Sequence, residues 1–556
     1  MTATESFQQP SFNLIDSPWV LCTDTHGDTR KLSLVEVFQQ ADDIVRLAGE
    51  SATQDMAVFR TLLVIFWRAN HTAGQLNSGD AEDIADWWLE RFWGETDIAR
   101  DIMEYFSAFR ERFDLLHPIT PFMQVSDLAT PKDTSDGLEK LIPDSENDYF
   151  SMRAGSGLQA IDFDEAARWL LHQHSWNYAG IKPGVIGDER VKSGKSFSIG
   201  TGWSGRSGGI ILHGRNLRES LLLNTNPQRV FGEDHEYDLP AWERPQGVPG
   251  THGREHSTGP CDLLTWQVRR VRLFVEDDKV VGILATNGDK LDLKNHFNDP
   301  MTAYRYSKPQ SKKNNIVHMP KAHSATRTMW RGIEPLLTRE GVVEGPAETR
   351  DHQPATLDWL REVQSIDQDA LQDTVIGVEL IGQEYGSNDS VYVSTIHEEI
   401  PMRLVLLADK DETAAHLLVT AADATMQAAI NVGQFAGNLS VAAGGDYVFS
   451  SDATDAVLHQ LNDPFKRWLT GYEPSKDLVA LRRAWFDFAK QTIIRYAQGL
   501  IRGAGPGAII GREHDDRYIS AATAWNMLIR QLDKRLPTRT SHQESADQPA
   551  TGKAHA

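Results

Sequence analysis

The chain has 556 residues and a formal net charge of −22, with 40% hydrophobic and 24% charged residues. This composition predicts a soluble globular protein with two or more domains. The acidic total argues against general nucleic-acid binding, because Lys and Arg supply most of that affinity. The longest apolar run, residues 61–67, is too short to cross a bilayer, and the N-terminus lacks a signal-peptide pattern. We therefore expect a cytoplasmic protein with no membrane partner.

Residues 1–395 mix helix and strand signals. Ser33 and Glu36 form the pattern of a capping box at the start of a helix, and apolar residues recur at helical spacing over residues 56–66. Residues 265–291 contain two runs rich in Val, Ile and aromatic residues around an acidic turn, which predicts a hairpin. We expect a large mixed α/β domain in which long irregular loops carry function.

Residues 191–209 contain six glycines among three Lys and Arg residues. Such a loop exposes backbone N–H groups beside positive charge, which suits phosphate. Gly194, Lys195 and Ser196 resemble the end of a nucleotide-binding P-loop, but Glu189 stands where that motif needs glycine. A loop that contacts phosphate without hydrolysing a nucleotide is therefore the better interpretation.

Two segments without Asp or Glu, residues 190–218 and 300–333, carry thirteen of the 56 Lys and Arg residues. This segregation indicates a local anion-binding face on an acidic protein. The alternative is two solvated loops of chance composition. A chain with this charge distribution should bind stray DNA weakly by itself.

Lys290 follows a tight-turn signal at residues 287–289, where we expect a hairpin tip that lets a long cation reach outward. The alternative is an ordinary solvated lysine. Residues 386–390 have the composition of a turn between two strands. The tip of that turn could read base edges or simply reverse the chain.

From about residue 410 the pattern changes to helical runs. These predict a four-helix bundle over residues 405–540, and we expect a disordered tail over residues 541–556. The fold class is therefore α+β, with a large mixed N-terminal domain followed by the bundle. The four runs are residues 411–439, 453–469, 475–500 and 514–536.

Histidine pairs give no strong metal signal. His514 and Asp515 resemble the doublet of metal-dependent phosphohydrolases, but Asp515 and Asp516 are explained more simply as carboxylates in the first turn of a helix. His172 and His174 would point to different faces of a helix, and the two cysteines lie far apart. We expect no metal, no cofactor and no catalytic centre.

Five motifs occur in a defined order, FNLIDSPWV (residues 12–20), LSLVEVF (32–38), HPITPFMQ (117–124), LEKL (138–141) and GRNLRESLLLN (214–224). In this order they resemble the CasA family, the large subunit of the type I-E CRISPR surveillance complex Cascade. The likeness covers nearly the whole chain, because the expected bundle also fits the family's C-terminal domain. It implies a non-enzymatic subunit that recognises the protospacer-adjacent motif (PAM) in double-stranded DNA. It also implies that the subunit promotes target unwinding and R-loop formation and recruits a helicase-nuclease.

The resemblance implies three elements that enter the minor groove at the PAM: a glycine loop, a lysine finger and a wedge. The wedge departs from the Asn-Gln-Ala of relatives, because an aspartate replaces the amide donor and brings negative charge toward phosphate. Either the wedge acts by steric insertion, or its neighbours make the contact. The matching residues are Gly200 and Gly202 in the loop, Lys290 in the finger, and Asn388, Asp389 and Ser390 in the wedge. Lys294 is the alternative residue for the finger.

A further loop of the family contacts the 5′ end of the guide RNA and fixes the subunit to the complex. It matches Phe150, Arg153, Gly155 and Gly157, where an aromatic ring could stack on a base and an arginine could meet phosphate. The implied partners are the backbone, small and guide-end subunits of Cascade, the CRISPR RNA, double-stranded target DNA and the helicase-nuclease. Some relatives carry a cysteine-rich zinc knuckle, but this chain lacks those cysteines, so we expect no metal.

Two other functions remain open from the sequence. One is a phosphate-ester enzyme that uses the glycine loop with His514 and Asp515, which turnover in the presence of Mg²⁺ or Mn²⁺ would favour. The other is a purely structural scaffold of a ribonucleoprotein. A scaffold predicts that changes at Lys290 and Gly200 leave DNA binding by the assembly unaltered.

Overall fold

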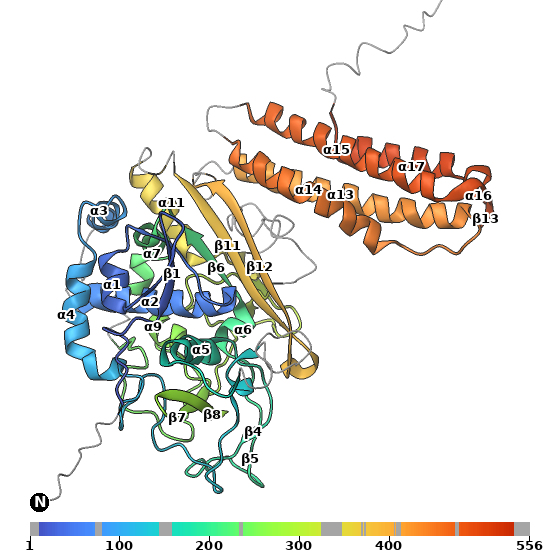
Figure 1. Cartoon of the computed structure of the whole chain (residues 1–556). Coiled ribbons are helices and arrows are strands. Elements are labelled where there is room, and N and C mark those ends of the chain that lie inside the picture. Colours follow the sequence, from blue (N-terminus) through green and yellow to red (C-terminus); the bar gives the residue numbers. More distant parts are fainter. Residues whose placement is uncertain are drawn as a thin grey trace, which may run out of the picture. The chain divides into compact units, whose positions relative to one another are not determined.

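The computed structural model divides the chain into two compact units (Figure 1). Unit 1 contains Met1–Arg327 and Arg339–Ile400, and unit 2 contains Thr328–Thr338 and Pro401–Ala556. The predicted guide-RNA loop and the tail lie outside the residues that the structure describes. The described residues are 10–72, 81–143, 158–232, 237–323, 347–367, 371, 374–404, 406, 413–472 and 477–538.

A long buried helix, α2 (Ala52–Thr72), forms the centre of unit 1. Its middle, from Leu62 to Trp67, is fully buried, because apolar side chains lie on every side of the helix, as in helices that other elements enclose. It packs against α5 (Phe163–Trp176) and α4 (Ala99–Phe109). The predicted core-facing helix is thus confirmed.

The N-terminal residues of unit 1 form a small antiparallel sheet in the order β2-β1-β3. The capping box between this sheet and α1 (Leu34–Gln39) is present as predicted. The Ser33 hydroxyl accepts a hydrogen bond from the Glu36 N–H (3.3 Å), and the Glu36 carboxylate accepts one from the Ser33 N–H (2.8 Å). Both groups satisfy donors that a helix start leaves open. The strands are β1 (Val20–Asp24), β2 (Thr29–Leu32) and β3 (Ile44–Leu47).

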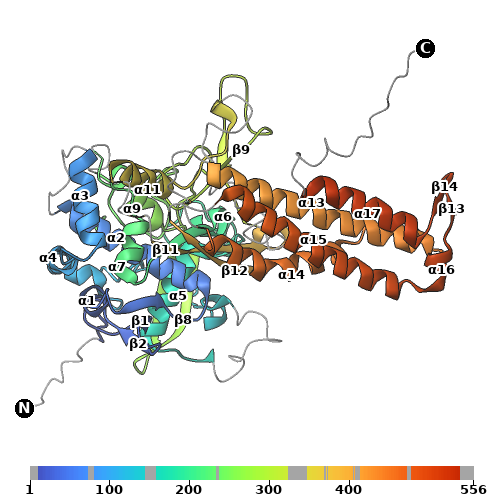
Figure 2. The same cartoon turned by 90° about the horizontal axis from the view of Figure 1, so that it is seen from above.

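A second antiparallel sheet lies beside α2 in the order β12-β11-β6 (Figure 2). The strand β6 (Gly209–His213) is buried along its whole length, and β11 (Val375–Tyr385) pairs with it. The edge strand β12 (Tyr392–Arg403) alternates exposed and covered residues, which is typical of a strand with one solvated face. The turn that joins β11 and β12 occupies the predicted position.

The predicted hairpin is formed by β7 (Arg269–Glu276) and β8 (Lys279–Asn287). Asp277 and Asp278 form its turn, with φ angles of 47° and 58°. The prediction of a tight turn at residues 287–289, with Lys290 at a hairpin tip, is wrong. After β8 the chain continues alongside its partner, because Gly288 N–H donates to the Val268 carbonyl.

Shorter elements connect these parts of unit 1. Figure 1 shows that β4 and β5 lie near the β7–β8 hairpin, whereas α11 lies at the opposite end of the unit. The helices are α3 (Ala81–Phe92), η1 (Arg110–Phe113), η2 (Leu138–Lys140), α6 (Trp203–Ser207), α7 (Leu217–Leu223), α8 (Pro227–Val230), α9 (Pro260–Leu264), η7 (Ala347–Thr349), α11 (Ala355–Ile366) and η8 (Ser387–Asp389). The further strands are β4 (Lys182–Pro183), β5 (Lys195–Ser196), β9 (Tyr304–Tyr306) and β10 (His318–Pro320).

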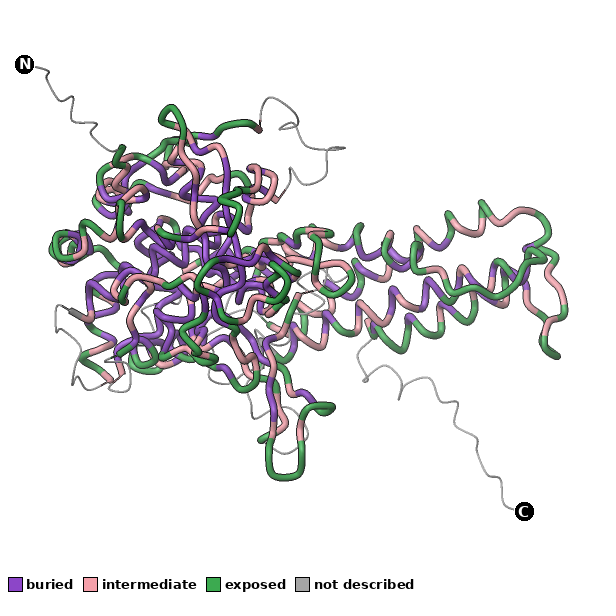
Figure 3. The backbone as a smooth tube through the Cα atoms, turned by 90° about the horizontal axis from the view of Figure 1, so that it is seen from below, coloured by how far each residue is buried: buried purple, intermediate pink, exposed green. Residues whose placement is uncertain are grey.

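Unit 2 is a bundle of four long helices in which α13 contacts the other three. Figure 3 shows buried positions alternating with exposed ones along these helices. Inside the bundle, the Trp485 indole donates to the Thr425 hydroxyl at 2.9 Å. The predicted α+β class with a C-terminal bundle is confirmed. The helices are α13 (Thr413–Ala442), α14 (Ser451–Thr470), α15 (Leu478–Gly503) and α17 (Ala521–Arg535), with the short α16 (Gly505–Ile510) before the last.

The last helix begins later than the sequence indicated. A hairpin of β13 (Arg512–His514) and β14 (Arg517–Ile519) precedes it, and Asp515 and Asp516 form the hairpin turn with φ angles of 49° and 58°. Their interpretation as helix-capping carboxylates is therefore wrong. Ser520 caps α17 instead. Among the described residues, no helix is long and apolar enough to span a bilayer.

Candidate nucleic-acid interface

The glycine-rich segment begins with a tight turn at residues 192–195, and β5, which follows this turn, pairs with β4. Lys192 and Lys195 exchange backbone hydrogen bonds of 3.1 Å across this turn. Gly194 occupies the left-handed region in this turn, with a φ of +74°. Both lysine side chains are exposed, and neither forms an ion pair with a described residue. The turn therefore presents two cations to solvent.

The other four cations of residues 190–218 are paired with carboxylates that lie outside this segment. An acid-free stretch of sequence thus becomes a mixed surface once the chain folds, and the positive charge is concentrated at the turn of Lys192 and Lys195. The pairs are Arg190 with Asp188, Arg206 with Asp389, Arg215 with Glu219, and Arg218 with Asp42.

Gly200 and Gly202 are glycines for different reasons. Gly200 is half-buried with a φ of +106°, a conformation that favours glycine. Gly202 is buried, and a Cβ there would lie 2.3 Å from the Ser175 carbonyl oxygen. Gly202 therefore lets the chain pack on the residues that end α5. Of the two, Gly200 lies closer to the surface and keeps space for a close approach.

Arg269 holds the glycine loop from inside the molecule. Its fully buried guanidinium donates to the carbonyl oxygens of Gly200 and Tyr178, both at 2.8 Å, and to Asn177 Oδ1 at 2.7 Å. Burial lowers its pKa to about 10. Since no described carboxylate pairs with this charge, the oxygen atoms around it supply its stabilisation. The sequence analysis did not single out Arg269. Its position in a predicted strand rich in apolar residues could have indicated a buried charge with a structural role.

The end of β8 is tied to the same loop through Asn287. The Asn287 side chain is buried, and its amide donates to the carbonyl oxygens of Ser196 (3.1 Å) and Phe197 (3.0 Å). The tight-turn interpretation of this asparagine failed for that reason. Its amide fixes two segments to each other, so the residues that follow β8 start from a point beside the loop.

Lys290 extends from a rigid support. The carboxylate of the preceding residue, Asp289, is buried and accepts a hydrogen bond from Arg270 at 2.7 Å. Burial opposes ionisation of Asp289, but Arg270 and the Thr251 hydroxyl outweigh it and lower the pKa. The Lys290 side chain is exposed and forms no hydrogen bond or ion pair with a described residue. The cation is therefore available to a ligand.

The turn between β11 and β12 bonds to residues on both sides of the glycine loop. The Asp389 carbonyl accepts a hydrogen bond from the Ala179 N–H at 2.8 Å, and its carboxylate pairs with Arg206 at 2.6 Å. The side chains of Asn388 and Ser390 are exposed. The negative charge at the turn is therefore paired within the protein, and its two polar neighbours are accessible to solvent.

The structure thus brings all three predicted segments to one region of unit 1. Residues 177–180 connect them, because Ala179 bonds to the β11–β12 turn and the Gly180 N–H donates to Ser198 Oγ at 3.1 Å. We call this region, formed by residues 192–202, Lys290 and residues 386–390, the loop cluster. An exposed cation and polar turn residues that are held by one hydrogen-bonded framework suit contact with a nucleic-acid groove.

The predicted guide-RNA loop, with Phe150, Arg153, Gly155 and Gly157, lies outside the described residues. The chain on both sides of it pairs with β8. Asp136 forms a β-bridge with Ile283, and Ile161 forms one with Val280. The two ends of that loop are therefore anchored to the strand that also leads to Lys290.

The histidine pairs show no catalytic arrangement. His172 and His174 are buried, and burial lowers their pKa values to about 3 and about 4. The Asp515 carboxylate lies 3.3 Å from His514 Nδ1 but is almost fully exposed at a hairpin turn. No group of three or more His, Cys, Asp or Glu side chains suited to a metal ion occurs among the described residues.

The sequence and the fold of this chain are similar to those of known CRISPR-associated proteins. A family model described as CRISPR-associated protein Cse1 matches residues 13–496. A CasA/Cse1 protein from Thermus thermophilus is 29% identical over 413 residues, which are 72% of this chain and 73% of that protein. The crystal structure of Thermobifida fusca Cse1 has a TM-score of 0.84 and 35% identity, and the match covers 96% of this chain and 99% of that one.

A chain of a CRISPR RNA-guided surveillance complex shares the fold, with a TM-score of 0.65 and 19% identity, and the match covers 88% of this chain and 99% of that one. The matches define a CRISPR-associated protein. This chain belongs to the Cse1 family, whose members are also called CasA. The predicted resemblance is therefore confirmed.

Proposed function

We propose that this chain is the subunit of a type I-E Cascade complex that recognises the PAM in double-stranded DNA through the minor groove. It promotes target unwinding and R-loop formation, and it recruits the helicase-nuclease. Its other partners are the backbone, small and guide-end subunits and the CRISPR RNA, in the cytoplasm. Catalysis belongs to the recruited nuclease and not to this chain.

The observation that carries the proposal is the loop cluster. Three segments that are far apart in sequence meet through Arg269, Asn287 and the hydrogen bond from Ala179 to Asp389. Minor-groove readers combine cations and amides with a shape that fits the groove. Lys290 supplies the cation, Asn388 supplies an amide, and Gly200 allows the backbone to come close.

The charge distribution of the chain favours DNA binding when the chain is docked in the complex, and disfavours it when the chain is free. Outside the loop cluster, the segment between β9 and β10 exposes Lys308, Lys312 and Lys313, and none of these side chains forms an ion pair with a described residue. These lysines can follow a phosphate backbone. With a net charge of −22 the rest of the protein repels DNA, so the isolated chain should bind DNA more weakly than micromolar.

Replacing Lys290 with alanine tests the proposal. In assembled Cascade, binding to target DNA with a permitted PAM should weaken about tenfold and lose about one unit of its dependence on log salt, because one exposed cation is removed. Electrophoretic mobility shifts at several salt concentrations measure both effects.

Lys294 is the matched control, since it is also exposed and lies four residues further along. Lys294→Ala should bind like the wild type. Unchanged binding in Lys290→Ala together with a loss in Lys294→Ala would move the finger to Lys294. Unchanged binding in both variants would favour a scaffold role.

A further inference from the structure

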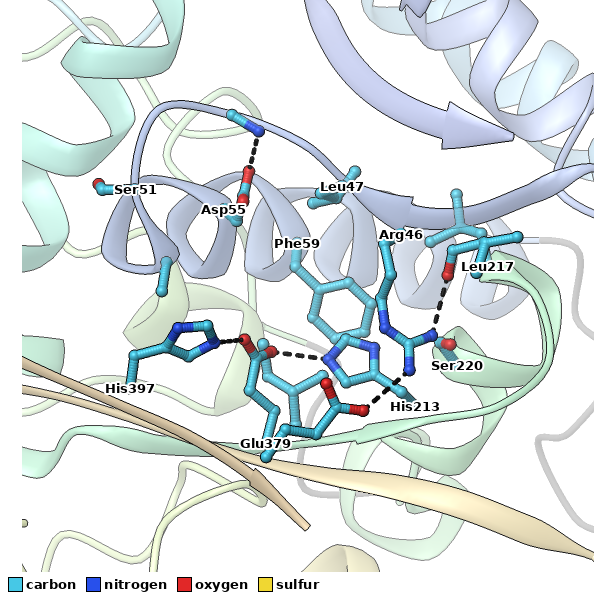
Figure 4. Close-up of a pocket in the computed structure, with 15 residues that line it drawn as sticks. Arg46, Leu47, Ser51, Asp55, Phe59, His213, Leu217, Ser220, Glu379 and His397 are labelled. Atoms are coloured by element: carbon cyan, nitrogen blue, oxygen red, sulfur yellow. Dashed lines mark hydrogen bonds and ion pairs between the residues drawn. The ribbon is translucent and has the colours of Figure 1, made fainter. Parts of the chain in front are cut away.

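A cavity of unit 1, of about 270 Å³, has no part in the proposed DNA contact (Figure 4). It lies between α2, the strand β3 and the sheet of β6, β11 and β12. One side of the cavity is apolar and the other carries ionisable groups. The apolar lining is formed by Val45, Leu47, Phe59, Ile211 and Leu217.

Most ionisable groups of the cavity neutralise one another. Glu379 accepts hydrogen bonds from Nε2 of His213 and of His397, both at 2.7 Å. These hydrogen bonds outweigh burial and lower the Glu379 pKa to about 2. Arg46 pairs with Glu399 at 3.1 Å. Figure 4 shows these two networks on the same side of the cavity.

Asp55 is the exception. Its carboxylate lines the cavity and accepts a hydrogen bond from the Gly49 N–H at 2.8 Å, but it forms no ion pair with a described residue. Burial raises its pKa to about 7, and the negative charge of Glu379 adds to the shift. Asp55 is half-buried, and Arg168 and His397 act on it only through space. A carboxylate that lines a cavity without an ion-pair partner among the described residues is typical of a ligand site.

We propose that this cavity binds a short primary alkylammonium ion, with the ammonium group on Asp55 and the alkyl chain against Phe59 and its apolar neighbours. The ammonium gives Asp55 an ion-pair partner through a charge-assisted hydrogen bond, and the alkyl chain leaves water for the apolar lining around Phe59. An organic cation fits better than a metal ion, because the described residues form no cluster of three metal-ligating side chains.

The pH dependence of this binding follows from the charges around Asp55. Alkylammonium ions stay protonated to about pH 10, whereas Asp55 is ionised above pH 7 and neutral below it. His397, whose pKa its hydrogen bond to Glu379 raises, gains charge at low pH and acts in the same direction. Binding should therefore be strong at pH 8.5 and weak at pH 5.5. The titratable and charged groups around Asp55 are Cys22, Arg46, Arg168, His213, Glu379, His397 and Glu399.

The test uses n-butylamine as the probe and n-butanol as its neutral analogue, with the full chain in isothermal titration calorimetry. The amine should bind about tenfold or more tightly than the alcohol, and about tenfold or more tightly at pH 8.5 than at pH 5.5. The isosteric Asp55→Asn keeps an acceptor for Gly49 and should lose amine binding at both pH values.

Glu276→Gln is the matched control, because it removes an exposed carboxylate of the same unit, at the turn of the β7–β8 hairpin. It should bind the amine like the wild type. Equal binding of amine and alcohol, or full binding by Asp55→Asn, would overturn the proposal. An equal loss in Glu276→Gln would also overturn it, by showing that the amine responds to the net charge of the chain. DNA binding by Cascade is a separate readout, so this site and the proposed function can fail independently.

Discussion

Gly200→Asp is expected to remove PAM-dependent DNA binding by assembled Cascade, with a loss of affinity of about tenfold or more, which corresponds to about 1.4 kcal/mol. The substitution places a carboxylate where the loop should approach DNA, and like charges repel the phosphates. The new carboxylate would also lie close to Arg206, because a Cβ at Gly200 is 3.8 Å from its guanidinium nitrogen. Arg206 would then be drawn away from Asp389.

Gly27→Asp separates this effect from backbone strain. Gly27 also has a positive φ, of +87°, and no atom lies within 4 Å of a Cβ placed there. Each variant should lose roughly 1 to 3 kcal/mol of folding stability from the strained conformation. Only Gly200→Asp should lose PAM-dependent binding in competition assays between permitted and forbidden flanks. Equal binding losses in both variants would remove the argument for Gly200.

Arg269→Met should have the largest effect on stability, with a loss of about 3 to 5 kcal/mol in unit 1. The change leaves the carbonyl oxygens of Gly200 and Tyr178 and the side chain of Asn177 without their buried donor. Hydrogen exchange should accelerate at residues 177–180 and 198–202, because Arg269 connects both stretches. Urea unfolding with hydrogen-exchange mass spectrometry measures the global and the local effect together.

Arg305→Met is the matched control. Arg305 is exposed on β9 and forms no ion pair with a described residue, so its loss should change stability by less than about 0.5 kcal/mol. Wild-type protection of residues 198–202 in Arg269→Met would contradict the role that we assign to the buried guanidinium.

The sequence correctly predicted those elements that depend on interactions between residues close to one another in the chain. The capping box of Ser33 and Glu36 and the apolar spacing of α2 depend on residues within a few positions of one another. The predicted start of α17 was wrong because the residues before it form the β13–β14 hairpin instead of the first turn of the helix. Asp515 and Asp516 adopt the left-handed turn of a hairpin, and no periodicity in the following helix reveals that.

The three segments of the loop cluster could be predicted from the sequence, but the hydrogen bonds that hold them together could not. Composition and family resemblance indicated the glycine loop, Lys290 and the β11–β12 turn. Their assembly depends on Arg269 and Asn287, which bond to residues about 70 to 90 positions away. The pairing of Arg206 with Asp389 joins residues that are still further apart in the sequence. It answers the electrostatic objection to an acidic wedge, since the carboxylate already has its counter-charge.

The measurement that most directly tests the central claim is binding of reconstituted Cascade, with and without this chain, to supercoiled target DNA. The DNA should carry a library of flanking trinucleotides, with a flank that is not permitted as reference. If the chain recognises the PAM, tight binding will require it and will depend on the flank. Equal binding without the chain, or equal binding to all flanks in its presence, would contradict the proposed function.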